Sequence, residues 1–392
     1  MADVTRLVTG SGRLLLPEPY DGPLPWAISL IDGHIATVGP AAEAPAADLT
    51  MDVGDSLVTP GLVDPHTHPV YAGDRSDEAA ARLAGQPYSG GGILRTVAAT
   101  RAASDAELEA LVEGRLLAQL AAGTTTVEAK SGYGLETEEE LRQLRILGRV
   151  AVRVPVHVVR TFLGAHALPP DRPDYVGEIV DEMLPAVAAE GLAEFCDVFC
   201  DQGFFGVADA DRILTAAAAH GLRLRLHADQ LARIGAPGLG VRLGAASIDH
   251  LEQLDGDDID VVARSGAIAT LLPGPALVMR DRLPPARALL DAGATLALAS
   301  DANAGTFGAW GAMPLVIGLG ATLLGMTVAE ALTAATRGGA AALGQTTRGH
   351  LGPGATADLV VWDAEHEGAF ALRLGEVRAR MVIVGGEVAI GS

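Results

Sequence analysis

Eight short apolar runs alternate with longer alanine- and leucine-rich stretches through the middle of this 392-residue chain. The runs have the length of β-strands, and several of the stretches between them have the length and composition of helices. Eight repeats of a strand followed by a helix predict an α/β fold, a (β/α)₈ barrel of the TIM type. The expected strands are residues 62–68, 124–130, 157–163, 195–200, 223–227, 246–250, 267–272 and 295–300. The clearest helical stretches are residues 105–122, 136–151, 175–190, 208–220 and 327–343.

Both ends of the chain have a different pattern, made of short strands. Asp32-Gly33 separates two strand-like runs near the N-terminus, which is a strong signal for a two-residue β-hairpin. Similar runs return near the C-terminus, at residues 358–362 and 380–384. The likeness of the two ends predicts one small β-sandwich formed by both termini. We therefore expect residues 1–60 and 351–392 to build the sandwich and residues 61–350 to build the barrel.

The first barrel run ends in His66-Thr67-His68, two histidines separated by one residue. In an extended backbone, residues i and i+2 point to the same side, so both imidazoles face one point and can share a metal ion. His227 closes the fifth run and Asp301 follows the eighth, at the strand ends where barrel enzymes place their chemistry. His66, His68, His227 and Asp301 are therefore candidate metal ligands.

Three neutral imidazoles and one carboxylate suit one divalent ion of the Zn or Fe(II) type and leave a position for water. Water bound in this way is acidified towards neutrality and can attack an electrophilic carbon. Asp301 is placed to accept the proton of the water, and His250, which ends the sixth run, to orient the water or stabilise developing charge. The sequence leaves the choice between Zn and Fe open.

Other polar side chains follow the same ends of the strands. Tyr133 follows the second run, His166 the third, Gln230 the fifth and Asn303 the eighth. The remaining histidines are expected to be structural, because they lie in the N-terminal hairpin, at the opposite end of the barrel, at a helix end or in polar stretches. They are His34, His157, His220, His350 and His366.

Two residue types are informative because they are rare. Lys130 is the only lysine of the chain, and it shares a strand face with Glu128, so we expect the two side chains to pair. Cys196 and Cys200 would lie about 13 Å apart along one strand, which is too far for a disulfide. We expect both to be buried thiols.

Composition limits the partners. A formal net charge of −21 argues against nucleic acid and anionic lipid, because phosphate binding relies on clustered positive charge. The apolar stretches are strand-sized or interrupted by Gly, Arg and Asp, so no membrane span is expected. The first residues lack a basic region followed by an apolar one, which argues for a cytoplasmic location. We expect a small anionic molecule as partner, no nucleic acid and no membrane, while a homodimer stays open.

Several segments resemble the amidohydrolase superfamily and, more closely, its imidazolonepropionase family, and the resemblance spans almost the whole chain. They include residues 60–68, Ala72-Gly73-Asp74-Arg75, residues 161–166, His227-Ala228-Asp229-Gln230 and Asp249-His250-Leu251-Glu252. The resemblance implies a hydrolase that opens the heterocycle 4-imidazolone-5-propanoate with water, giving N-formimidoyl-L-glutamate in histidine degradation. It implies His66, His68, His227 and Asp301 as metal ligands and, around the substrate, Arg75, Tyr133, His166, Gln230, Asn303, Gly305 and Thr306.

The resemblance can be compared with the chemistry of particular residues. A propanoate tail needs a guanidinium, and Arg75 can form a two-pronged contact with it. Related barrels with two metal ions carry a carboxylated lysine on strand four, but residues 195–200 contain no lysine, which favours one ion. After Asp301 the family usually reads Cys-Asn-Pro-Gly, whereas this chain reads Ala-Asn-Ala-Gly-Thr. The loss of the proline should loosen this loop, and two aromatic residues at positions 307 and 310 can reshape the pocket.

One-metal aminohydrolases, which release ammonia from a nitrogen heterocycle, are the alternative function. They resemble this chain in the candidate ligands but use a glutamate three residues after the strand-five histidine to shuttle protons. Gln230 stands at that position, and an amide cannot act as general acid or base. Gln230 is therefore expected to orient the substrate in a reaction that opens the ring without releasing ammonia. A non-catalytic barrel is disfavoured, because all four ligand positions are filled.

Overall fold

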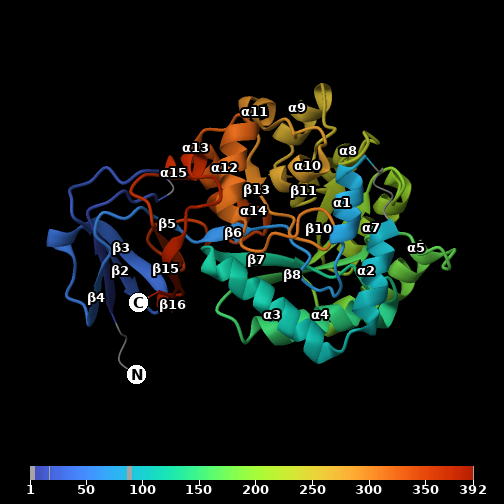
Figure 1. Cartoon of the computed structure of the whole chain (residues 1–392), viewed down its shortest axis with the longest axis horizontal. Helices are drawn as coiled ribbons and strands as arrows, with labels where there is room; N and C mark the ends of the chain where they lie inside the picture. The colour runs from blue at the N-terminus through green and yellow to red at the C-terminus, as the bar shows by residue number, and fades with distance from the viewer. Residues whose placement is uncertain (1–4, 17, 86–90, 392) are drawn as a thin grey trace.

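The structure, a computed structural model, describes residues 5–16, 18–85 and 91–391. Within these residues, eight parallel strands follow one another in sequence order and curl into a barrel (Figure 1). Helices cover the outside of the strands, so the predicted (β/α)₈ barrel is confirmed. The barrel strands are β6 (Leu62–Asp64), β7 (Thr124–Lys130), β8 (His157–Ala165), β9 (Phe195–Cys200), β10 (Arg223–Ala228), β11 (Ser247–His250), β12 (Ile268–Leu271) and β13 (Leu296–Leu298).

The helix α4 (Thr137–Ala151) illustrates why the intervening stretches are helical. It has three glutamates in its first turn and Arg149 in its last, an arrangement that complements the helix dipole. Its buried face, which includes Leu144 and Leu147, packs against β8. The other helices around the barrel are α1 (Ser76–Leu83), α2 (Gly91–Ala102), α3 (Asp105–Ala121), α5 (Tyr175–Glu178), η2 (Ile179–Met183), α6 (Leu184–Glu190), α7 (Val207–Ala219), α8 (Ala236–Leu243), α9 (Asp257–Arg264), α10 (Pro273–Met279), α11 (Ala286–Asp291), α12 (Met313–Leu323), α13 (Val328–Thr333), η3 (Ala334–Gly338) and α14 (Gly339–Ala342).

The first barrel strand is shorter than the sequence predicts. It ends at Asp64 instead of residue 68, because Pro65 has no backbone N–H to donate to a neighbouring strand. Pairing resumes at Thr67, which bridges to Ala302, and the N–H of His68 donates to the carbonyl of Ala302 (2.9 Å). The extended backbone therefore continues through the histidine pair and brings the first and last strands of the barrel together.

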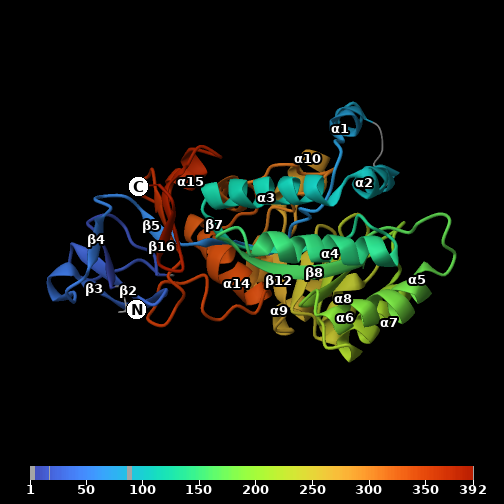
Figure 2. The ribbon, with the colours of Figure 1, turned by 90° about the horizontal axis from the view of Figure 1, so that it is seen from below.

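The two chain ends form two four-stranded sheets beside the barrel. Figure 2 shows them at one end of the molecule, with α1 and α2 at the other. The two sheets share a core that includes Trp26, Ile28, Leu359 and Ile383, so the predicted sandwich of both termini is confirmed, while its boundaries at residues 60 and 350 stay a prediction. The first sheet consists, in spatial order, of β3 (His34–Pro40), β2 (Trp26–Ile31), β1 (Arg6–Gly10) and β4 (Leu49–Asp52). The second consists of β16 (Glu387–Ile390), β15 (Ala379–Val384), β14 (Leu359–Trp362) and β5 (Val58–Pro60). Two short helices, η1 (Ala41–Glu43) and α15 (Ala369–Leu372), flank them.

The strand β14 connects the sandwich to the barrel. Leu359 and Val361 point into the core of the sandwich, whereas the alternate residues Val360 and Trp362 belong to the core of the barrel. The Trp362 ring stands against Gly123, where an added Cβ would come within 2.7 Å of it. The sandwich therefore rests on the barrel through one face of a sheet, and position 123 has room only for glycine.

Three local sequence predictions are also confirmed. The Asp32-Gly33 turn joins β2 to β3 with both residues at positive φ (50° and 75°). Cys196 and Cys200 are free and buried. The Nζ atom of Lys130 donates to Oε1 of Glu128 over 2.7 Å. In the part of the chain that the structure describes, no helix is long and apolar enough to cross a membrane.

Candidate metal centre and active site

A small cavity lies at the carboxyl ends of the barrel strands. The residues predicted for the site line it, with the exception of His66, which is fully buried behind the others, and Gly305. Sequence reasoning missed Ile93 and Phe199, because an apolar side chain in an apolar run carries no chemical signal. The lining residues are His68, Arg75, Ile93, Tyr133, His166, Phe199, His227, Gln230, His250, Asp301, Asn303 and Thr306.

Three donor atoms converge beside this cavity. Nε2 of His66 lies 3.3 Å from Nε2 of His68. Oδ1 of Asp301 lies 3.3 Å from Nε2 of His68 and 3.7 Å from Nε2 of His66. Donors bound to zinc at about 2.0–2.1 Å in a tetrahedron are about 3.3–3.4 Å apart. The spacing and the chemistry of these donors therefore fit a metal ion.

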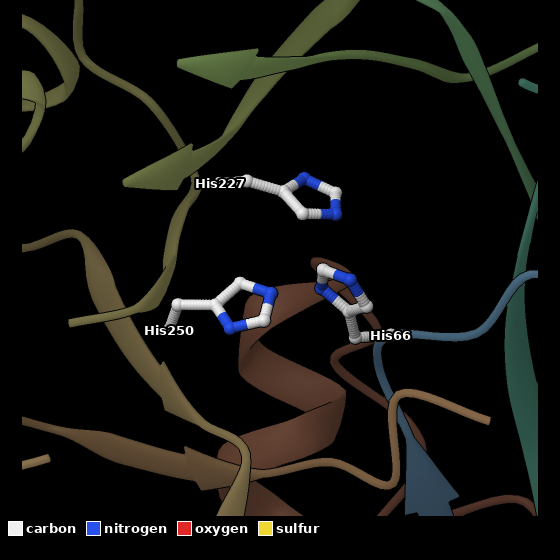
Figure 3. A group of neighbouring side chains, drawn as sticks. All are labelled: His66, His227 and His250. Carbon is white, nitrogen blue, oxygen red and sulfur yellow. The ribbon is translucent and has the colours of Figure 1, made fainter. Parts of the chain in front are cut away.

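His227 and His250 complete the cluster, and Figure 3 shows their rings directed towards the ring of His66. The His227 ring lies 4.4 Å from the His66 ring, centroid to centroid, and the donor atoms of His66, His227 and His250 all lie within 4.8 Å of one another. His66 belongs to three groups that could hold a metal ion, one with His227 and His250, one with His68 and Asp301, and one with Asp197 and Asp249. The first two groups together contain the four predicted ligands and His250.

Two buried aspartates face the outer nitrogen atoms of two of these histidines. Oδ2 of Asp249 lies 2.7 Å from Nδ1 of His66, and Oδ2 of Asp197 lies 3.0 Å from Nδ1 of His227. An acceptor at Nδ1 favours the tautomer with its proton there, which leaves Nε2 as an electron-pair donor. Burial, and then the charge of Lys130, hold the pKa of His66 well below its ordinary value, so this ring is neutral.

Sequence reasoning did not identify Asp197 and Asp249 as site residues. A signal was present, because Asp197 is the only charged residue in the apolar run of β9, and Asp249 precedes His250 in β11. A charged residue within a buried strand indicates an ionic contact, since a charge without a partner is costly there. The run itself does not tell which side chain of another strand supplies the partner.

The electrostatic environment distinguishes Asp301 from His250. Burial raises the pKa of the Asp301 carboxyl, but the hydrogen bond and charge of His68 outweigh burial and hold this pKa below its ordinary value. Burial lowers the pKa of His250, but the charge of Glu252, whose Oε1 lies 3.4 Å from Nδ1, outweighs burial and raises it to about 9. Both His250 and Asp301 have positive φ (79° and 49°), a conformation that non-glycine residues adopt at an energetic cost. The site therefore combines a carboxyl group of lowered pKa with an imidazole of raised pKa, both on backbone with positive φ.

Arg75 is buried, and its guanidinium lies between two glycines. A Cβ added to Gly92 or Gly305 would overlap the guanidinium, so both positions require glycine while Arg75 keeps this place. Glu78 accepts hydrogen bonds from Nε (3.0 Å) and Nη2 (2.6 Å) of Arg75. Arg75 thus lines the cavity as predicted, with one edge of its guanidinium held by a carboxylate of the protein itself.

The loop after β13 is organised by Asn303. Its Oδ1 accepts from the N–H groups of Gly305 (2.7 Å) and Thr306 (2.8 Å), and its Nδ2 donates to the carbonyl of Asp301 (2.7 Å). Its backbone N–H donates to the carbonyl of Phe307 over 3.1 Å. These bonds connect the two sides of the loop, while the predicted loosening by the loss of the proline stays a prediction.

Tyr133 and His166 stand on another wall of the cavity. Their ring centroids lie 5.1 Å apart, and His166 stacks on His68 at 5.1 Å. Nδ1 of His166 lies 2.9 Å from the carbonyl of Gly132, which leaves Nε2 as an acceptor. Burial raises the pKa of the Tyr133 phenol, so it stays a hydrogen-bond donor. Gln230 lines the cavity beside them, as predicted.

Comparisons with known proteins show the family of the chain. A model of the amidohydrolase family matches residues 71–390. The chain is 46% identical over 384 residues to the imidazolonepropionase of Caulobacter vibrioides (strain NA1000 / CB15N), which covers 94% of each chain. It is 46% identical over 394 residues to the imidazolonepropionase of Salinispora arenicola (strain CNS-205), covering 98% of this chain and 97% of that one.

Solved structures show the same fold at lower sequence identity. A 5-methylcytosine deaminase from Klebsiella pneumoniae has a TM-score of 0.79 at 16% identity and covers 98% of both chains. A triazine hydrolase variant has a TM-score of 0.77 at 19% identity, covering 99% of this chain and 95% of that one. At such identities the likeness concerns the fold, and the activity has to be argued from the site.

Proposed function

The chain belongs to the amidohydrolase family and, within it, to the imidazolonepropionases, and we propose that it hydrolyses 4-imidazolone-5-propanoate to N-formimidoyl-L-glutamate in histidine degradation. In this reaction water adds its oxygen to the ring carbonyl carbon, the ring C–N bond breaks, and the departing nitrogen takes up a proton. That nitrogen stays in the product, so no ammonia leaves. The observation that carries the proposal is the convergence of the predicted ligands and substrate residues on one cavity.

We propose that His66, His68, His227 and Asp301 hold one divalent ion, Zn or Fe. The separations of 3.3, 3.3 and 3.7 Å between the donor atoms of His66, His68 and Asp301 support this set. When bound, such an ion polarises a carbonyl group and lowers the pKa of water, which makes hydrolysis feasible at neutral pH. The strand β9 contains no lysine that could be carboxylated to bridge a second ion, which supports a single one.

Asp301 and His250 are the proposed proton carriers. Oδ1 of Asp301 faces the histidines, whereas its Oδ2 lies 3.5 Å from the hydroxyl of Thr306. One oxygen can therefore bind the ion while the other accepts a proton from the attacking water. A protonated His250 can stabilise the negative charge that develops on the ring carbonyl oxygen and orient the water.

The substrate is proposed to bind through its charged tail and its polar ring. Arg75 is assigned to the propanoate, because a guanidinium can bind a carboxylate through two N–H groups, and Glu78 accepts hydrogen bonds from its Nε and Nη2. The Tyr133 phenol, Nε2 of His166 and the Gln230 amide are available for the ring carbonyl and ring nitrogens. Asn303, Gly305 and Thr306 form the loop that closes this part of the cavity.

The alternative, an aminohydrolase that releases ammonia, receives less support. Deaminases are among the structural neighbours, but at 16% identity that likeness concerns the fold. Gln230 has no carboxyl group with which to carry a proton to a departing ammonia.

The experiment that tests the proposal is incubation of the purified, metal-loaded protein with imidazolone propanoate. Loss of ring absorbance and stoichiometric appearance of formimidoylglutamate are expected, with no ammonia above a control without enzyme. The His66→Ala variant is the matched inactive control, and His366→Ala, which changes an exposed histidine outside the cavity, should retain full activity. Release of ammonia from an aminated heterocycle by a protein inert towards imidazolone propanoate would overturn the proposal.

A further inference from the structure

A layer of charged side chains lies beneath the histidine cluster. It consists of the fully buried residues Glu128 and Lys130 of β7, Asp197 of β9, Arg225 of β10 and Asp249 of β11. Barrel interiors are usually filled by branched apolar side chains, and burying charges costs free energy even when they are paired. Apolar residues of similar volume often stabilise a fold as well or better. The presence of this layer therefore calls for an explanation other than stability.

One arm of the layer connects Lys130 to His227. The Nζ atom of Lys130 donates to Oε1 of Glu128 (2.7 Å) and to Oδ2 of Asp197 (2.8 Å). The same Oδ2 lies 3.0 Å from Nδ1 of His227, and Oδ1 of Asp197 accepts from the backbone N–H of His227 over 3.2 Å. The cation thus holds the oxygen atom that faces the histidine.

A second arm repeats this arrangement between Arg225 and His66. Nη2 of Arg225 donates to Oδ2 of Asp249 (2.8 Å), and this oxygen lies 2.7 Å from Nδ1 of His66. Nη2 also donates to the carbonyl of Pro65 (2.7 Å), next to His66 in the chain. The hydroxyl of Ser247 donates to the other oxygen of Asp249. Both arms therefore have the same order of groups, a cation, a shared carboxylate oxygen and an imidazole Nδ1.

The third candidate ligand with an imidazole, His68, has a buried Nδ1 without a hydrogen-bond partner among the described residues. Nδ1 of His227 also lacks an aligned hydrogen bond, but it lies 3.0 Å from a carboxylate oxygen of Asp197. The charged layer also has three carboxylates for two cations, which leaves one net negative charge below the cluster. An excess of negative charge at this place favours a cation above it.

We propose that Lys130 and Arg225 are positioning residues of the metal centre, which hold Asp197 and Asp249 as fixed acceptors for Nδ1 of His227 and His66. Each acceptor keeps the proton on Nδ1 and directs the electron pair of Nε2 towards the ion. Without its cation, an aspartate would share a buried space with Glu128 or stand alone, and it would turn away or take up a proton. The inference rests on the proposed metal centre and adds the residues that prepare it.

The first test measures zinc affinity by competition with a chromogenic chelator. Asp197→Asn and Asp249→Asn keep the shape of the side chains but remove the charge, and each should weaken zinc binding roughly 10- to 100-fold. Asp358→Asn is the matched control, because Asp358 is also buried and paired with an arginine, Arg348, but lies in the sandwich region. It should lower thermal stability and leave zinc affinity unchanged.

The second test reads the tautomers directly, by NMR of the metal-free protein labelled with ¹⁵N in its histidines. In the wild-type protein both His66 and His227 should carry the proton on Nδ1. Asp249→Asn should change the signals of His66 and leave those of His227, and Asp197→Asn should do the reverse. If the aspartates had only a structural role, the two variants would not each change the signals of a different histidine.

A double-mutant cycle tests whether Lys130 acts through Asp197 and Arg225 through Asp249. Lys130→Met alone should weaken zinc binding about as much as Asp197→Asn, and adding it to Asp197→Asn should cost little more, because the two residues act in series. Arg225→Met and Asp249→Asn should behave in the same way. If Lys130→Met or Arg225→Met does not fold alone, the zinc affinity of the double variant, in which the aspartate is also neutral, is compared with that of the Asp→Asn variant.

The outcomes separate this inference from the proposed function. If the wild-type protein binds no metal and lacks activity, the metal centre itself is wrong. If it binds zinc and is active but Asp197→Asn and Asp249→Asn bind zinc as tightly and keep both tautomers, the metal centre stands and the positioning role is wrong. If the losses of zinc affinity were additive in the double variants, Lys130 and Arg225 would not act through the aspartates, and the positioning role of the two cations would be wrong.

Discussion

The backbone N–H of Asp301 donates to the carbonyl oxygen of His66 over 3.1 Å, so two proposed metal ligands also join the last strand of the barrel to the first. Neighbouring bonds strengthen this junction. The N–H of Ser300 donates to Oδ1 of Asp64 (3.0 Å), and Thr67 bridges to Ala302. Closure of the barrel and assembly of the metal centre thus take place at the same few residues, and an ion bound there should stabilise the closed barrel.

The first prediction follows from this junction. Removing the metal with a chelator should abolish activity and lower the unfolding temperature, and adding Zn²⁺ or Fe²⁺ should restore both. A ligand present at 100 times its Kd stabilises the folded state by about 2.7 kcal/mol, so the shift should be visible by calorimetry. His66→Ala and His68→Ala should lose metal and activity together, as measured by elemental analysis and turnover. Full activity after exhaustive chelation would contradict the metal-dependent mechanism.

The fold was predictable from the sequence because it depends on local periodicity. The runs that become β7 and β9 start and end at the predicted residues, and Asp32-Gly33 forms the predicted hairpin. The predicted ligands converge because the carboxyl ends of parallel strands lie at one end of a barrel, whatever the register. The first strand was the most overextended, since its pattern continues past Pro65 although its backbone pairing stops there. The last was also predicted too long, as residues 295–300 instead of Leu296–Leu298.

Contacts that depend on register between strands could not be predicted. Asp249 meets His66 across 183 residues of sequence, and Asp197 meets His227 across 30. Arg75 was predicted as a substrate residue, but its position between Gly92 and Gly305 depends on three separate loops and helices. Such contacts follow from the packing of the whole barrel, and no short pattern in the sequence encodes them.

The second prediction concerns the tail of the substrate. Arg75→Lys keeps the charge but loses the planar pair of N–H donors, so KM for imidazolone propanoate should rise about 10-fold or more. Turnover of an imidazolone that lacks the propanoate should be the same in variant and wild type. Arg95→Lys changes an exposed arginine paired with Asp77 and serves as the control. A wild-type KM in Arg75→Lys would reassign Arg75 to a structural role with Glu78.

The third prediction concerns the loop after β13. Asn303→Ala removes the acceptor of Gly305 and Thr306 and the donor to Asp301, so it should raise KM and lower kcat. Asn303→Asp keeps the acceptor oxygen and loses the donor, so its defect should be smaller in KM. Steady-state kinetics of both variants, with thermal unfolding to show that the barrel is intact, provide the measurement. Equal defects in KM would show that the acceptor bonds do not shape the cavity.

The fourth prediction concerns the two thiols. Burial raises the pKa of both, that of Cys200 to about 12, so neither forms a thiolate in the folded protein at neutral pH. Native protein should resist iodoacetamide at pH 8, and denatured protein should be modified at both positions, as mass spectrometry will show. Because the folded state binds these protons more tightly than the unfolded state, stability should fall as pH rises above about 9. Rapid modification of the native protein would contradict the buried placement.

The last prediction concerns Gln230, whose side chain separates ring opening from deamination. An amide can donate to a ring carbonyl or accept from a ring N–H, but it cannot carry a proton, so Asp301 and His250 have to manage the protons. Gln230→Glu should therefore retain some ring-opening activity with an altered pH dependence. Gln230→Ala should raise KM more than it weakens zinc binding, because the residue lines the cavity and belongs to none of the groups of candidate metal ligands.

The matched control for this prediction is Gln202→Glu, which adds the same charge at an exposed position outside the cavity. Its pH profile should follow that of the wild-type protein. A change found only in Gln230→Glu would therefore show that residue 230 acts on the substrate. Product analysis decides between the two reactions: formimidoylglutamate without ammonia is expected from the wild type and from both glutamate variants. If Gln230→Ala lost its metal and kept a wild-type KM, Gln230 would support the metal centre and not the substrate. Ammonia release by the wild-type protein would restore the deaminase alternative, because Gln230 would then no longer exclude it.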